Sequence, residues 1–520
     1  MTYKPKLTAA PFGRRDSRHM LISREGALWL SLAAEGAPSM IPTAPRPAGL
    51  LEISVLVKGV PTPYTYSATE SVVELKAPGG VARITHDCAM RALRVEAEGI
   101  SLRFDGKIAA GVSSLNTADG PVINIGGGRY VFVSKRGKVK FDDSWVLASF
   151  GSVTPVVDVE PVGGIIELTI YELPGDTALP AAAKTFEQCA ADNSAEYSAF
   201  AKKIVRLPEK FSKLRGDVTY SLWLNSKKLE NGRYCIAENR SSSTAASAHG
   251  QAIASLAFRD FDTAFELLTS LPESSPPLHG LAVMRMIDDG MLDGAPVAKL
   301  RELYFALEKT AKWWRENRTL PGAALSYYAY RFETGHWNPA SFTAGAPVLA
   351  PDLNAYLVLL YEALSQFAAN FGDAETSDKY AAAAKARLDA MLDTLWDGER
   401  FFAVNVYSGE REIPKLSKPE SSRYAPLGQS ETPVILGERL PKHVLSKLAE
   451  TVIEAGAPET NPRSGPDLEY PLRIIALAAA GERKKAKALA LGEIERVTAE
   501  NVVTDPIYGA ALLALAAKAI

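Results

Sequence analysis

The hydrophobic pattern of this chain changes its period once, and that change constrains the fold more than any other feature. From about Arg24 to Leu173, short segments such as LEISVLVKG and GIIELTIYEL alternate apolar and polar residues, and Gly, Pro or Asp-Gly pairs separate many of them. From residue 185 onward the apolar residues recur every three or four positions. The sequence therefore predicts an antiparallel β domain followed by a helical domain.

The alternating region favours a large β-sandwich over a small barrel. It holds roughly ten or more candidate strands, and two sheets can each bury one face against the other. A helix over 185–205 would connect this domain to the rest of the chain. We therefore expect a β-sandwich domain over 1–180, a linker helix over 181–210 and a helical domain over 211–520.

The helical domain should form an (α/α)6 barrel. Helices are predicted near 212–226, 244–258, 260–270, 276–289, 298–317, 352–370, 374–396, 440–454, 466–480, 482–497 and 506–518, with a weak one near 421–429. An open α-solenoid should show a repeat of fixed length, and none is visible. The long connections 229–243, 319–350 and 398–424 would then form a concave cup at one mouth of the barrel.

Composition excludes several classes of function. Lys and Arg number 58 against 60 Asp and Glu, without a basic run, so no nucleic-acid partner is expected. Neither a secretory signal nor an apolar stretch of about 18 residues is present, which favours a soluble, cytoplasmic protein without membrane contact. Cys88, Cys189 and Cys235 lack metal-ligand spacing and are interpreted as buried, reduced thiols. We expect no metal and no cofactor, and the sequence leaves a homo-oligomer open.

Two predicted loops carry polar and aromatic side chains suited to a small carbohydrate. Flat rings fit the C–H faces of sugars, polar groups bind the hydroxyls, and an arginine suits an acidic sugar. The loop ETGHWNPAS supplies a carboxylate, an imidazole, an indole and an amide, and the segment CIAENRSSSTAASAHGQ supplies further polar groups. The candidate residues are Glu333, His336, Trp337, Asn338 and the nearby Tyr328 from the first region, and Glu238, Arg240, His249 and Gln251 from the second.

Four stretches of the helical half resemble the glycoside hydrolase clan of trehalases, processing oligosaccharide α-glucosidase and mannosylglycerate hydrolase. They are SSPPLHGLAVMRM, APVLAPDLNAYLVLLYEAL, LWDGERFFA and YAPLGQSETPVILGERLP, in the order and approximate spacing of that clan over 212–520. The resemblance implies an (α/α)6 barrel, often preceded by a β-sandwich, and inverting hydrolysis of a small, α-linked glycoside. In that mechanism a carboxylic acid protonates the glycosidic oxygen, while a carboxylate about 6.5 to 9.5 Å away activates water.

The chain departs from the clan where the clan carries its acid. Relatives place an aspartate in a Glu-Ser-Gly-aromatic-Asp-Asn loop, and here either Trp337 or Asn338 stands at that position. Neither side chain can donate the proton, and losing this assistance costs a factor of roughly 10² to 10⁴ in rate. The base of the clan corresponds to Glu500, followed by Val502 where relatives have tyrosine. Ser247-Ala248-His249 replaces a Trp-Asp-His triplet.

These departures leave three interpretations open. The leading one is a glycoside hydrolase with Glu500 as base and Glu333, the nearest carboxyl, as acid; Asp352 and Glu238 are weaker alternatives. Glu333 could instead fix its loop, Asp352 suits a helix start, and His279 suits a structural role. The second interpretation is a catalytically silent carbohydrate-binding protein. The third is a lyase or epimerase on the same barrel, since fold alone does not select the chemistry.

Overall fold

The computed structural model divides the 520-residue chain into two compact units. Unit 1 comprises Met1–Lys202, Thr219–Lys227 and Ala237–Thr244, and unit 2 comprises Lys203–Val218, Lys228–Ile236 and Ala245–Ile520. The structure describes all residues except 1–2, 9, 16, 18, 33–50, 88–90, 107–112, 126–127, 144, 147–151, 154, 174–177, 181–183, 230, 238–247, 271–275, 335–339, 413–429, 456–469 and 500–505.

Unit 1 contains two large antiparallel sheets, as the alternating pattern predicts. One has the strand order β1-β2-β3-β9-β16-β13, with β4 also paired to β3, and the other has the order β10-β11-β12-β17-β8-β7-β6-β5. A separate hairpin joins β14 and β15. The strands are β1 His19–Arg24, β2 Ala27–Leu32, β3 Leu51–Val57, β4 Val60–Thr62, β5 Thr65–Ala68, β6 Val73–Ala77, β7 Gly80–Asp87, β8 Ala92–Glu98, β9 Ser101–Asp105, β10 Ser113–Thr117, β11 Gly120–Ile125, β12 Gly128–Arg136, β13 Lys138–Asp142, β14 Trp145–Val146, β15 Ser152–Val153, β16 Val156–Glu160 and β17 Ile165–Leu173.

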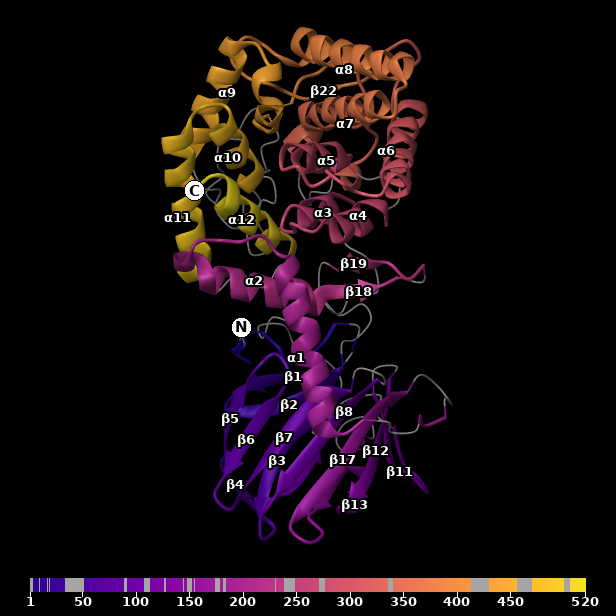
Figure 1. Ribbon diagram of the computed structural model, residues 1–520, viewed down its shortest axis with the longest axis vertical. Helices are drawn as coiled ribbons and strands as arrows, with labels where there is room; N and C mark the ends of the chain where they lie inside the picture. Colours follow the sequence, from indigo (N-terminus) through magenta and orange to yellow (C-terminus); the bar gives the residue numbers. More distant parts are fainter. Residues whose placement is uncertain are drawn as a thin grey trace. The chain divides into compact units, whose positions relative to one another are not determined.

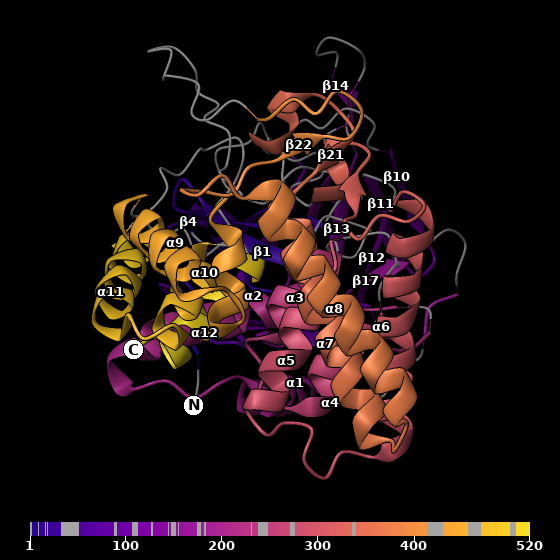
Figure 2. The same ribbon diagram turned by 90° about the horizontal axis from the view of Figure 1, so that it is seen from above.

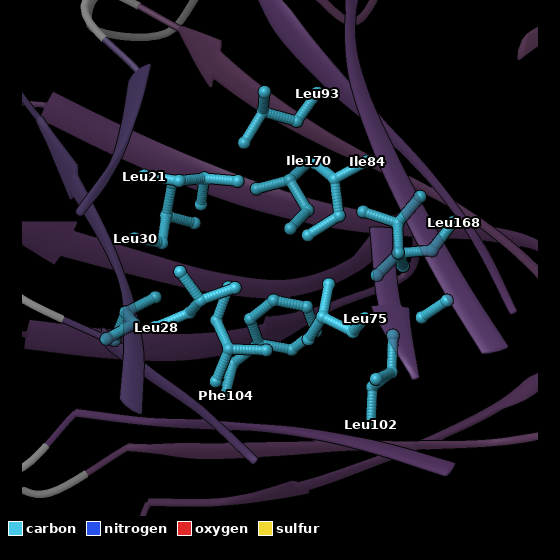
Figure 3. Packing of buried hydrophobic residues seen from close by; sticks show 14 of the residues in the cluster. Leu21, Leu28, Leu30, Leu75, Ile84, Leu93, Leu102, Phe104, Leu168 and Ile170 are labelled. Carbon is cyan, nitrogen blue, oxygen red and sulfur yellow. The ribbon is translucent and has the colours of Figure 1, made fainter. Parts of the chain in front are cut away.

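The core of unit 1 lies between the two sheets. Leu102 and Phe104 point inward from β9 because side chains two apart lie on the same face of a strand. Leu168 and Ile170 of β17 meet them from the opposite sheet (Figure 3). The alternation in the sequence is therefore the signature of a sandwich in which each sheet buries one face.

The predicted linker helix packs on the strands of unit 1. This helix, α1, spans Phe186–Lys203. The side-chain amide of Asn193 donates to the carbonyl of His86 at 2.8 Å and to the Thr85 hydroxyl at 3.2 Å. Glu196 accepts two hydrogen bonds from Arg14, at 2.7 and 3.0 Å. These contacts explain why residues up to 202 belong to the β unit.

Unit 2 is a closed ring of helices. Its inner segments pack in the order α3, α5, α7, η4, α10 and α12, and α12 packs back on α3. Outer helices cover them: α4 on α3, α6 and α8 on α7, α9 on η4, and α11 on α10 (Figures 1 and 2). The helices of this unit are α3 Ala248–Ser255, α4 Phe261–Thr269, α5 His279–Asp288, α6 Val297–Asn317, α7 Pro351–Asn370, α8 Ala374–Leu395, α9 Lys442–Ala455, α10 Tyr470–Ala479, α11 Arg483–Ala499 and α12 Pro506–Lys518, with the 3₁₀ segments η1 Glu209–Phe211 and η4 Thr432–Arg439. The helix α2 (Ser212–Asn225) is divided between the two units after Val218.

Local signals start several of these helices. Asp260 and Asp373 cap α4 and α8 by accepting hydrogen bonds from the backbone N–H of Thr263 and Thr376, at 3.1 and 3.0 Å. Pro351 occupies the first turn of α7, where its missing N–H is not needed. Nearly every side chain of α7 is buried, since inner helices contact neighbours on all sides.

One inner segment of the ring was not among the predicted helices. The fourth inner position is taken by η4, a 3₁₀ segment that contains Gly437 at φ 57° and ψ −130°. This left-handed glycine breaks the helical period, so the segment carries no 3.6-residue pattern. The weak helix expected near 421–429 lies outside the described residues and stays a prediction.

The connections define a mouth at one end of the ring. Short links, such as 371–373 between α7 and α8, run from an inner segment to its outer helix. Long links, including 318–350 and 396–431, run from an outer helix to the next inner segment. Because consecutive packed helices alternate in direction, the long links gather where the inner segments begin. We call this end the mouth.

Two smaller predictions concern the cysteines and membrane-spanning helices. Cys189 and Cys235 are buried free thiols, whereas Cys88 lies outside the described part. Among the described helices, none combines the length and the apolar character that a membrane crossing requires.

Candidate functional site at the mouth of the helical ring

A small three-stranded sheet joins two of the predicted mouth loops. It consists of β20 (Tyr327–Tyr328) and β21 (Val348–Leu349) from the 318–350 connection, and β22 (Val404–Asn405) from the 396–431 connection. The pairs Tyr328 with Val348, and Val348 with Asn405, fix the register. The two loops therefore form one structure over the start of α7 instead of moving independently.

Two residues predicted to contact substrate are enclosed in the wall of the mouth. Tyr328 is fully buried, and its hydroxyl donates to a carboxylate oxygen of Asp352 at 3.0 Å, at the start of α7. Gln251 on α3 is also fully buried and holds the backbone of Ile236 through bonds of 2.9 and 2.5 Å. Neither side chain exposes surface to a ligand in this structure.

Glu333, the predicted acid, is bound on all sides. It lies in η2 (Arg331–Thr334) with 4% of its surface exposed. One carboxylate oxygen accepts from the Arg318 guanidinium at 2.7 and 2.5 Å, and the other accepts from the Ala329 N–H at 2.6 Å. Both oxygens of the carboxylate are therefore occupied by contacts within the protein. They support the alternative interpretation, in which Glu333 fixes its loop.

A buried polar network holds the same loop, at Ser326, to α7 and α8. The side-chain carbonyl of Asn354 on α7 accepts from the Ser326 N–H at 2.9 Å and from Arg387 of α8 at 2.6 Å. Its amide donates to the carbonyls of Ser326 and Ala350, both at 2.9 Å. All four bonding positions of this amide are therefore used, which ties α7 and α8 to the entry of the small sheet.

Among the described residues of this mouth, Glu412 has a carboxyl whose pKa is clearly altered by its surroundings. Its backbone pairs with Ala403 in the arm of the loop that continues from β22, with the Glu412 N–H donating to the Ala403 carbonyl at 2.9 Å. Burial raises the pKa of its carboxyl to about 7, and the charge of Glu431 adds to the rise. A hydrogen bond from Ala403 and the charge of Arg400 oppose the shift.

Glu431 links this group to the next inner segment of the ring. It immediately precedes η4, and its carboxylate lies 3.9 Å from the guanidinium of Arg473 on α10. Arg473 is itself buried. The mouth thus combines a carboxyl whose pKa is raised to about 7 with a second carboxylate, 3.9 Å from an arginine, whose charge contributes to that rise. A carboxyl with a raised pKa near a second carboxylate is an arrangement that acid–base chemistry can use.

Several predicted site residues lie outside the described residues. These are Glu500, His336, Trp337, Asn338, Glu238 and Arg240, and the same holds for the side chain of His249, whose backbone lies in α3.

The sequence reasoning also overlooked Glu412, although it lies in the predicted mouth connection 398–424. Its neighbours in the sequence, Glu410 and Arg411 before it and Ile413 and Pro414 after it, give no local sign of burial. The rise in its pKa depends on burial and on Glu431, which is distant in the sequence.

Comparison with known proteins agrees with this architecture. Residues 253–433 match the family described as the mannosylglycerate hydrolase MGH1-like glycoside hydrolase domain. A bacterial glucoamylase solved with acarbose aligns over 98% of this chain and 93% of its own, with a TM-score of 0.52 and 11% identity. A family GH92 α-mannosidase from Bacteroides thetaiotaomicron, solved with mannoimidazole, aligns over 97% and 80%, with a TM-score of 0.50 and 12% identity. No curated protein sequence is a significant match.

These likenesses identify the fold. The described inner segments close a ring, the solved structures match across both units, and the family match covers the part of the ring from α3 to η4. The chain is an N-terminal antiparallel β-sandwich followed by a helical domain of the (α/α)-barrel type, and it resembles the (α/α)-barrel glycoside hydrolases, as its sequence motifs predicted.

Proposed function

We propose that the protein hydrolyses a small, α-linked glycoside at the mouth of the helical ring by an inverting mechanism. The observation that carries the proposal is Glu412, a buried carboxyl at this mouth with a pKa of about 7. A general acid works best when its pKa lies near the working pH, because it then holds a proton and can still release it. Glu412 therefore replaces Glu333 as the proton donor.

The same reasoning assigns Glu333 a supporting role. Both of its carboxylate oxygens are held, one by Arg318 and the other by the Ala329 N–H, and the side chain is buried, so it is not placed to reach a glycosidic oxygen. Its contribution is to hold the loop that precedes Trp337 and Asn338. This assignment resolves the missing aspartate without requiring an amide or indole to act as an acid.

The partner carboxylate activates water on the opposite face of the sugar. Glu500, which precedes α12, is the sequence-based candidate for this base. Glu431 is a second candidate, because it precedes η4 at the same mouth and its carboxylate lies 3.9 Å from the guanidinium of Arg473. Inversion requires the acid and the base to be about 6.5 to 9.5 Å apart, which leaves room for the water.

Hydrolysis of a panel of aryl glycosides and natural disaccharides tests the proposal. The variants are Glu412→Gln, Glu500→Gln and Glu431→Gln, with Glu410→Gln as the matched control, because Glu410 is exposed in the same loop. We expect Glu412→Gln to lower kcat by roughly 10² to 10⁴ on natural substrates and the control to remain active. Full activity of Glu412→Gln would remove it as the acid. Full activity of both other variants would remove both candidate bases.

The changed mouth motifs favour one alternative, a carbohydrate-binding protein without turnover. The aspartate expected in the 333–338 loop and the Trp-Asp-His triplet are both replaced in this sequence. Calorimetry with the same panel separates the two functions. Sugar affinity without any product over days would support the binding protein, whereas turnover would exclude it.

A further inference from the structure

A cavity of about 460 Å³ lies in the helical ring among α4, α5 and α6. Its lining includes Leu268 and Thr269 from the end of α4, His279 from the start of α5, and Phe305 and Lys309 from α6. This volume falls in the range of small-molecule sites, which is about 300 to 1,000 Å³. The residues of the mouth described above, from Tyr328 to Glu431, do not line it.

His279 contributes to the cavity lining a buried ring nitrogen that needs a hydrogen-bond partner. Only 3% of its surface is exposed, and its Nδ1 has no hydrogen-bond partner in the described part of the chain. Buried polar atoms are rarely left in this state, since losing a bond to water without replacing it is costly. Burial lowers the pKa of His279 to about 4, so the ring is neutral near pH 7. A hydroxyl group can satisfy its Nδ1 in either tautomer, because a hydroxyl both donates and accepts.

The helix that carries His279 is held rigidly. A Cβ on the adjacent Gly280 would overlap the Leu360 backbone and lie 2.7 Å from the carbonyl carbon of Leu359. Only glycine allows α5 to approach α7 this closely. His279 lies one position away on the same turn, so the backbone that carries its ring is fixed against α7.

The charges around the cavity are unbalanced. Arg233 and Glu302 neutralise each other in an ion pair, and Arg233 also donates to the Thr269 hydroxyl at 2.7 Å. Arg301 and Lys309, which also line the cavity, form no ion pair among the described residues; the Arg301 guanidinium lies over the Phe371 ring at 5.0 Å. Two cations thus remain available for an anionic group, while Leu268, Ala306 and Phe305 provide apolar surface.

We propose that this cavity is a second ligand site, which takes a small hydroxylated organic anion of the sugar-acid or sugar-phosphate class. The carboxylate or phosphate binds Arg301 and Lys309, and a hydroxyl of the same molecule bonds to Nδ1 of His279. The carbon skeleton lies against Phe305 and Leu268. The site does not depend on the proposed hydrolysis, because none of its residues belongs to the proposed acid or base.

Calorimetry on the full chain tests this site with four probes: gluconate, glucose 6-phosphate, inorganic phosphate and glucose. We expect at least one of the two hydroxylated anions to bind with a Kd of about 1 mM or tighter. The double variant Arg301→Gln/Lys309→Gln should weaken that binding at least tenfold. The matched control is Lys312→Gln/Arg315→Gln, which removes two exposed cations from the same helix outside the cavity and should retain the wild-type Kd.

The histidine provides an independent readout. With ¹⁵N-labelled histidine, only six residues contribute ring signals. His279, assigned with His279→Gln, should shift on addition of the bound anion in the wild type. A preference for gluconate or for glucose 6-phosphate identifies the anionic group.

Three results would overturn the proposal: equal weakening in both double variants, no binding of either hydroxylated anion, or inorganic phosphate binding as tightly as the sugar phosphate with His279 unmoved.

Discussion

Replacing Glu412 with glutamine should stabilise the protein above neutral pH while removing its proposed chemistry. The folded protein raises the pKa of this carboxyl from 4.5 to about 7. Each tenfold change in proton affinity is worth about 1.4 kcal/mol, so the rise corresponds to about 3 kcal/mol. The folded state binds this proton more tightly than the unfolded chain does. Its stabilising effect is therefore fully present below pH 4.5 and is lost as the pH rises through about 7.

Glutamine keeps the shape and the neutral state of the protonated acid at every pH. The difference in the free energy of unfolding between Glu412→Gln and wild type should therefore grow by about 3 kcal/mol in favour of the variant between pH 4.5 and above 7. Urea unfolding followed by circular dichroism at 222 nm measures this difference across the range. Glu410→Gln is the control, because its side chain is exposed in the same loop.

Parallel pH dependences of wild type and Glu412→Gln would refute the reasoning. They would mean that the carboxyl is as well solvated in the folded protein as in the unfolded chain. A group buried for chemistry often costs stability, and this variant measures that cost directly.

Three further substitutions test the supporting structure. Gly280→Ala should destabilise the helical unit by about 3 kcal/mol or more, because its Cβ meets the α7 backbone. The control is Gly492→Ala on α11, where no atom lies within 4 Å of the added Cβ; it should change the melting temperature little or raise it. Equal effects of the two substitutions would contradict the packing of α5 on α7. Asn354→Ala should lower the free energy of unfolding, measured with urea, by about 2 to 4 kcal/mol, since it leaves Arg387 and Ser326 without their partner. The control, Asn370→Ala at the exposed end of α7, should lower it by under about 1 kcal/mol. Glu333→Gln should lower the melting temperature through loss of the Arg318 pair but leave the pH profile of kcat in place. A lost alkaline limb would return Glu333 to the role of proton donor.

Much of the architecture follows from periodicity in the sequence. Strands such as β3 and β17, and helices such as α6 and α7, fall within a few residues of their predicted ranges because one face of each is continuously apolar. The segment η4 was missed because Gly437 interrupts its period. The strands of the small mouth sheet contain only two residues each, too few for any pattern to appear.

The site was harder to predict than the fold. Glu333 has the right position and residue type for an acid, but Arg318, fifteen residues earlier, binds its carboxylate in the fold. Glu412 has an unremarkable sequence context, and its pKa depends on burial and on Glu431. Arg387 lies in a helix that was predicted correctly, yet its burial against Asn354 follows only from the packing of α7 on α8. Protonation is a tertiary property, and local sequence does not encode it.

The most direct test of the central claim is the dependence of hydrolysis on the leaving group in Glu412→Gln. A proton donor matters most when the departing alkoxide is a strong base and least when the leaving group is already stable as an anion. We predict that Glu412→Gln loses roughly 10² to 10⁴ in kcat/KM on alkyl glycosides but little on dinitrophenyl glycosides of the same sugar. An equal loss for all leaving groups, or no loss for any, would contradict the assignment of Glu412 as the acid.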